Sequence, residues 1–135
     1  MSSALENLCG PGKPLRAEPP DEAEIAGLVR SAQRRLTDAA RPDLSLDSRF
    51  DLAYGAAHAL CLAALRRRGY RATQRYIVFQ VLPHTLGLGP EVWRVLSRSH
   101  DLRNLAEYEG ESHATTELIE ELTAIGQKLI ARLKL

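Results

Sequence analysis

Four long stretches of the chain repeat apolar residues at the spacing of one helix face. The i, i+3, i+4, i+7 pattern predicts helices over about 21–39, 45–68, 90–108 and 112–133. The second stretch is apolar almost all the way round, which is typical of a helix buried at the centre of a bundle. We therefore expect the other helices to pack around residues 45–68.

Residues that favour helix ends flank these stretches. Asp21 follows Pro20 at the first start, and Ser45 can cap the second. Gly69 and Gly110 follow the second and third stretches, where glycine commonly ends a helix. Arg66 to Arg68 fall in the last turn before Gly69, where cations suit the helix dipole.

A further segment, 72–82, mixes two signals. Residues 76–79 favour a strand, but the chain offers no second strand to pair with them. Ile77, Val78 and Val81 also fit one helix face, so the pattern predicts a helix that Pro83 distorts or ends. The fold class is then all-α, with residues 21–135 forming a five-helix bundle of the up-and-down type.

Residues 1–20 form a separate N-terminal arm. Residues 4–9 can make one helical turn, whereas the glycines and prolines of 10–20 forbid regular structure. We expect 10–20 to be an extended, flexible tail. The alternative is a strap that lies across a partner.

Composition narrows the function classes. The chain has 135 residues with a formal net charge of +1, which excludes a global basic excess of the kind that marks many nucleic-acid-binding proteins. Cys9 and Cys61 are far apart and lie in no CxxC motif, so we expect reduced thiols, no metal and no cofactor. The most apolar window, 60–65, is too short to span a membrane, and we expect a cytoplasmic protein.

Several polar residues of the predicted helix 90–108 lie beside its apolar face. Arg103 falls inside that face, and Glu107 is its i+4 partner. His100 and Asn104 border the same stripe. We expect a buried Arg103, whose replacement by alanine would cost about 3–5 kcal/mol. An internal ion pair that fixes helix packing is the alternative to a functional site.

The buried helix 45–68 has matching polar positions. Asp51 and His58 fall on one side of it with Tyr54 alongside, and Asp51 or His58 could face Arg103. A lone buried histidine is most often a packed core residue, and His58 has that simpler interpretation.

These residues carry a resemblance to a known family. The segment RFDLAYGAAHALCLAALRRRGY, followed by HDLRNLAEYEG, resembles the HEPN families of helical, nucleotide- or RNA-associated domains. The stretch 21–133 can be laid on the five-helix plan of that family. The N-terminal arm followed by a helix also resembles small bacterial members of the family.

The resemblance implies a homodimer. Many HEPN proteins are metal-independent ribonucleases with an Arg-x4–6-His motif, in which the histidine acts on the 2′-OH or the leaving oxygen and the arginine on the phosphate. Others lack the histidine and serve as binding modules, beside nucleotidyltransferase domains or in toxin–antitoxin systems. This chain has Tyr108 where the nucleases place histidine, and a tyrosine is a poor general base at neutral pH.

Three hypotheses follow. The first is a non-catalytic HEPN-like module that binds a nucleotide, RNA or protein partner through an edge formed by Arg103, Asn104 and Tyr108. The second is a toxin-like ribonuclease in which His100 or His113 serves with Arg103; the Arg94 to His100 spacing is a chance match, since Arg94 lies on the outer face. The third is a bundle whose polar edge only holds a dimer together.

Overall fold

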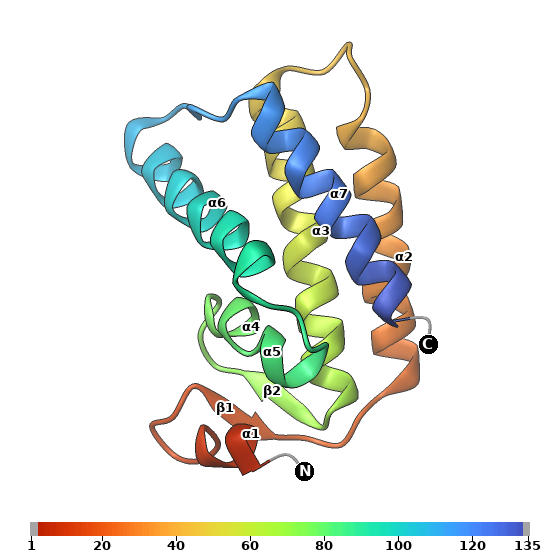
Figure 1. The fold of residues 1–135 in the computed structure, drawn as a ribbon, viewed down its shortest axis with the longest axis vertical. Coiled ribbons are helices and arrows are strands. Elements are labelled where there is room, and N and C mark those ends of the chain that lie inside the picture. The colour runs from red at the N-terminus through yellow and green to blue at the C-terminus, as the bar shows by residue number, and fades with distance from the viewer. Residues whose placement is uncertain (1–2, 134–135) are drawn as a thin grey trace.

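The computed structural model describes residues 3–133, which form seven helices and two short strands (Figure 1). The elements in chain order are α1 (Ser3–Asn7), β1 (Leu15–Ala17), α2 (Glu22–Ala39), α3 (Leu46–Arg67), β2 (Tyr70–Ala72), α4 (Ile77–Gln80), α5 (Leu82–Thr85), α6 (Pro90–Glu109) and α7 (Thr116–Leu133). The prediction of a mostly helical bundle is confirmed. The four long helices lie where the hydrophobic spacing predicts them.

Helix α3 is the central element of the bundle, as predicted from apolar residues on nearly all of its faces. Helices α2 and α7 run alongside it, and α6 leans across the bundle at an angle (Figure 1). Gly126 of α7 allows close packing, because a Cβ built there would lie 2.8 Å from both methyl carbons of Leu36 in α2.

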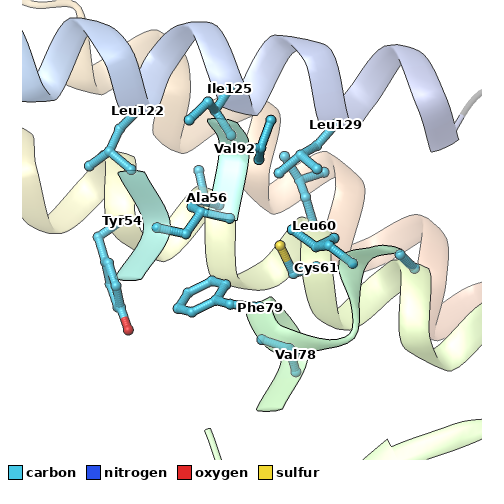
Figure 2. Close-up of a cluster of buried hydrophobic side chains, with 14 of the residues drawn as sticks. Tyr54, Ala56, Leu60, Cys61, Val78, Phe79, Val92, Leu122, Ile125 and Leu129 are labelled. Atoms are coloured by element: carbon cyan, nitrogen blue, oxygen red, sulfur yellow. The ribbon is translucent and has the colours of Figure 1, made fainter. Parts of the chain in front are cut away.

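The core lies between α3, α7 and the short helix α4. Figure 2 shows Tyr54, Leu60 and Cys61 of α3 packed with Phe79 of α4 and Leu122 of α7, all of them buried. Burial raises the pKa of the Cys61 thiol, because the thiolate would lose its hydration. Cys61 is therefore an inert packing residue.

The helix ends follow the predicted signals. The Asp21 carboxylate accepts hydrogen bonds from the backbone N–H groups of Ala23 (3.0 Å) and Glu24 (3.2 Å), and the Ser45 hydroxyl accepts one from Ser48 N–H (3.1 Å). Gly110 ends α6 with a φ of 89°, a left-handed conformation that glycine adopts without strain. Helix α7 begins at Thr116, four residues later than predicted.

The prediction of one helix over 72–82 is wrong. Residues 70–72 form strand β2, and helix begins only at Ile77. The helix ends after one turn and restarts as α5, which carries Pro83 in its first turn, where its missing N–H costs nothing. The partner strand that seemed to be lacking is β1, more than fifty residues earlier in the chain.

The expectation of a flexible tail over 10–20 is also wrong. Strand β1 pairs antiparallel with β2, Leu15 opposite Ala72, and Leu15 is fully buried. Leu5 of α1 is buried as well. The arm is therefore a strap, as the alternative proposed, but it lies across its own chain.

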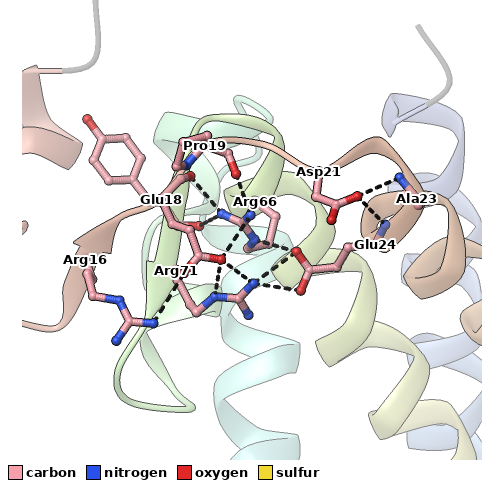
Figure 3. A network of polar contacts seen from close by, with 9 residues as sticks. Arg16, Glu18, Pro19, Asp21, Ala23, Glu24, Arg66 and Arg71 are labelled. Carbon is pink, nitrogen blue, oxygen red and sulfur yellow. Dashed lines mark hydrogen bonds and ion pairs between the residues drawn. The ribbon is translucent and has the colours of Figure 1, made fainter.

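An ion network joins this strap to the bundle (Figure 3). Arg66 is completely buried, and its guanidinium donates to Glu24 Oε1 (2.8 Å) and to the carbonyl oxygens of Glu18, Pro19 and Tyr70. Arg71 donates to Glu18 Oε2 (2.8 Å) and to both oxygens of Glu24. The interpretation of 66–68 as a cap for the helix dipole therefore misses the main role of Arg66.

None of the helices over 3–133 is long and apolar enough to cross a membrane.

Candidate functional site

Helices α3 and α6 bring three of the predicted site residues into one hydrogen-bonded chain. The hydroxyl oxygen of Tyr54 on α3 lies 3.1 Å from His100 Nδ1 on α6. The other ring nitrogen, Nε2, lies 3.1 Å from Asn104 Nδ2, one turn further along α6. Tyr54 is buried, whereas His100 is half-buried and Asn104 is exposed. The chain therefore runs from the core to the surface.

Aromatic rings fix the orientation of His100. The centroid of the Tyr76 ring lies 4.5 Å from that of the His100 ring. The Phe79 ring meets His100 edge-on, with 6.4 Å between the two ring centroids. The Tyr76 hydroxyl donates to Ser97 Oγ (2.9 Å), which ties that ring to α6. The imidazole is thus held by packing against two neighbouring rings as well as by hydrogen bonds.

Both nitrogens of His100 are engaged. With the Asn104 amide donating to Nε2, the neutral ring carries its proton on Nδ1 and donates it to the Tyr54 oxygen. A reversed Asn104 amide would give the other tautomer, again with both nitrogens occupied. His100 can therefore exchange a proton with a ligand only after one of these bonds breaks.

Arg103 lies beside these hydrogen-bonded residues, and its side chain is partly exposed. Its guanidinium carbon lies 5.3 Å from the centre of the Tyr54 ring, within range of a cation–π interaction. Its Nη1 donates to Glu107 Oε1 at 2.9 Å, so the predicted i+4 pair is confirmed. The expectation that Arg103 is buried is wrong, because its side chain is 30% exposed.

A second cation, Arg75, also lies close to Tyr54. Burial raises the pKa of the Tyr54 hydroxyl, and a hydrogen bond from Arg75 and the charges of Arg75 and Arg103 oppose that rise. Arg75 is exposed and, within residues 3–133, belongs to no ion pair. The sequence analysis did not identify Arg75, because nothing in the sequence of the turn between β2 and α4 indicates that its side chain lies close to Tyr54 of α3.

His58 is a packed residue, which is the simpler of its two interpretations. Its Nε2–H donates to the Arg75 carbonyl oxygen (3.2 Å), and its ring packs edge-on against Phe79. Burial, together with the charge of Arg75, lowers the pKa of His58 to about 4. His58 is therefore neutral at physiological pH and braces the turn that carries Arg75.

Asp51 lies near Arg103 but is not its ion-pair partner. Both residues line a surface hollow of about 260 Å³ between the start of α3 and the end of α6. Asp47, Glu107 and Glu111 line it as well. Four carboxylates line this hollow and disfavour an anion there, so an anion is better accommodated where Arg103 contacts Tyr54.

Tyr108 points away from this cluster. It is 92% exposed, and five residues of helix place it roughly 140° around α6 from Arg103. Leu105, 41% exposed, lies on the same outward face as Tyr108 and Asn104. The predicted edge therefore divides into two surfaces that share Asn104. One is the cluster of Tyr54, Arg75, His100 and Arg103, and the other is the outward face of α6.

The remaining histidine and arginine candidates lie elsewhere. His113 is exposed and pairs with Glu109 (Nε2 to Oε1, 2.7 Å) beyond the last turns of α6. Arg94 lines a different hollow, next to Trp93 and Pro83. Neither contributes to the cluster. Over residues 3–133, no group of three or more His, Cys, Asp and Glu side chains is arranged to hold a metal ion.

Comparison with protein-family models, curated proteins and solved structures finds no match to this chain. The HEPN resemblance therefore stays a prediction that depends on the quoted residues.

Proposed function

We propose that the chain is a non-catalytic, HEPN-like helical module that binds a phosphate-bearing ligand, a nucleotide or a short RNA segment, at the Tyr54–His100 cluster. One observation carries the proposal: Arg75 and Arg103 both lie close to Tyr54, while both His100 nitrogens are already hydrogen-bonded. The cluster supplies cations for a phosphate without a free group for acid–base chemistry.

The ligand's contacts follow from the exposed groups. Arg103 keeps donors that Glu107 does not use, since a guanidinium has five N–H groups. Arg75 supplies a second guanidinium, and the Asn104 amide has a further N–H. The acidic hollow beside Arg103 disfavours phosphate, so an anion is better accommodated where Arg103 contacts Tyr54.

The outward face of α6 is proposed as the homodimer contact. In residues 3–133, the large apolar side chains with the greatest exposure are Leu46, Leu105 and Tyr108. Leu46 begins α3 beside Asp47, and Asp47 shares the acidic hollow with the end of α6, so all three lie at one end of the molecule. A second copy that covers this end would bury them.

Ligand binding is tested by titrating the protein with AMP and, separately, with an adenosine decanucleotide, followed by amide chemical shifts. We expect shifts at residues 75, 100 and 103, and about tenfold weaker binding for each of Arg75→Ala and Arg103→Ala. Arg34→Ala, on the exposed side of α2, is the matched control and should bind normally. Stronger binding of the oligonucleotide than of AMP would identify RNA as the ligand.

The ribonuclease hypothesis is tested with the same proteins. We expect no RNA cleavage above background, because a positioned acid–base group contributes about 10²–10⁴-fold and none is free here. Cleavage that both His100→Ala and Arg103→Ala abolish would overturn the proposal in favour of a metal-independent ribonuclease. Absence of any shift with both ligands would leave a protein partner, such as a nucleotidyltransferase, as the occupant.

The dimer is tested by light scattering at tens of micromolar protein. We expect twice the chain mass, falling to a single chain in a Leu105→Ser/Tyr108→Ser variant, because that variant removes apolar area from the contact. A monomeric wild-type protein contradicts this part of the proposal.

A further inference from the structure

A second surface hollow lies at the N-terminal strap, and it shares no residue with the Tyr54–His100 cluster. It occupies about 710 Å³ between the loop 9–13, strand β1 and the residues that directly follow β2. This volume falls in the range of small-molecule sites, roughly 300–1,000 Å³. Neither the proposed ligand site nor the proposed dimer contact accounts for it.

The walls of the hollow are fixed by backbone hydrogen bonds. Gly10 N–H donates to the Leu15 carbonyl (3.0 Å), and Thr73 N–H donates to the Pro14 carbonyl (2.8 Å). The Thr73 hydroxyl donates to the Lys13 carbonyl (3.0 Å), which ties the loop to the residue after β2. Gly12 turns the loop with a φ of 73°, which favours glycine. A ligand would enter a preformed site and would pay little ordering entropy.

The charged side chains that line the hollow are both cations, Lys13 and Arg16, and no carboxylate lines it. The Lys13 ammonium donates to the Asn7 carbonyl (3.2 Å), which leaves two of its three N–H groups for a ligand. Arg16 is exposed, and its contact with Glu18 Oε1 is long, at 3.4 Å. The hollow beside Arg103 has the opposite character, since four acidic residues line it. The strap hollow therefore favours an anion.

The rest of the wall is mainly apolar. Cys9, Pro11, Ala17 and two glycines contribute no charge, and Thr73 and Gln74 add uncharged polar groups at one side. A free inorganic anion would fill only part of such a space. An apolar body with one acid group would contact both the cations and the apolar wall.

We propose that the hollow formed by loop 9–13, strand β1 and residues 73–74 binds a small organic anion, a compact apolar group that carries one phosphate or carboxylate, through Lys13 and Arg16. This site is independent of the proposed function at α3 and α6.

The experiment compares four probes by amide chemical shift: phenyl phosphate, benzoate, benzyl alcohol and inorganic phosphate. We expect phenyl phosphate or benzoate to shift Gly10, Gly12 and Thr73, and benzyl alcohol and inorganic phosphate to bind at least tenfold more weakly. The stronger of the two anionic probes identifies the acid group. Equal binding of benzyl alcohol, or no shift with either organic anion at about 10 mM, would overturn the proposal.

Two variants connect the binding to the cations. Lys13→Ala and Arg16→Gln should each weaken the better probe about tenfold. Both variants should stay folded. Lys13 is exposed, and Glu18 keeps its contacts with Arg66 and Arg71 when Arg16 is replaced. Arg34→Ala is again the control. If both variants bind as wild type, the proposal is wrong even where the shifts are seen.

Discussion

Arg66 and Arg103 both pair with glutamates, but their surroundings differ. Arg66 is fully buried, and four protein oxygens accept hydrogen bonds from its guanidinium. Arg103 is 30% exposed and has one carboxylate partner, one helical turn away. The buried cation is fully satisfied by the protein, so it acts as a structural pin for the strap. The exposed cation keeps unused donors, so it is the one that can bind a ligand.

The first prediction concerns the buried cation. Arg66→Ala should lower the free energy of unfolding by about 3–5 kcal/mol, because it leaves carbonyl oxygens of the strap and Glu24 without their donor. Urea denaturation measures this loss. Arg68→Ala, two residues later on the surface, is the control and should cost less than about 1 kcal/mol. An equal loss of unfolding free energy in the two variants would show that the buried hydrogen bonds of Arg66 do not stabilise the fold.

The second prediction concerns acid. A hydrogen bond from Arg71 lowers the pKa of Glu18, and hydrogen bonds from Arg66 and Arg71 lower the pKa of Glu24, both below the ordinary value of 4.5. Because the folded pKa is the lower one, the ion network stabilises the protein fully above pH 4.5 and loses that contribution as the pH falls through the folded pKa. Glu18→Gln should therefore show a smaller fall in melting temperature between about pH 6 and about pH 3 than wild type. Parallel curves would mean that Glu18 does not carry the acid sensitivity.

The third prediction concerns the exposed cation. Arg103→Ala should cost less than about 1 kcal/mol, because an exposed i,i+4 ion pair contributes little and the cation–π contact adds a similarly small amount. The same urea denaturation measures it, with Glu107→Gln as the matched variant. A loss as large as that of Arg66→Ala would mean that Arg103 is buried in the protein as it exists in solution.

The fourth prediction has the smallest effect and concerns His58. With a pKa of about 4, its ring should stay neutral, so its NMR ring signals should not move between about pH 8 and about pH 5. Arg75→Ala should raise this pKa slightly, because it removes a nearby positive charge while the ring stays buried. A His58 that titrates above about pH 6 would show that the ring is open to water.

Local patterns in the sequence predict the four long helices and most of their ends. Periodic apolar residues, the Asp21 and Ser45 caps and Gly110 act within one or two turns of chain, so local pattern is sufficient for them. The Arg103–Glu107 pair was predictable for the same reason, since i+4 neighbours meet on any helix.

The remaining features depend on contacts between segments that lie far apart in the chain. Strand β2 exists because β1 lies beside it, and a pairing between residues so far apart leaves no local signal. Arg66 is buried beneath the strap residues Glu18 and Pro19, whereas Arg103, on an apolar stripe, is 30% exposed. Arg75 joins the site through the turn that follows β2. Burial and long-range contacts depend on how the helices pack against each other. Helical spacing in the sequence therefore identifies Arg103 and His100 as candidate site residues but gives no sign of Arg75.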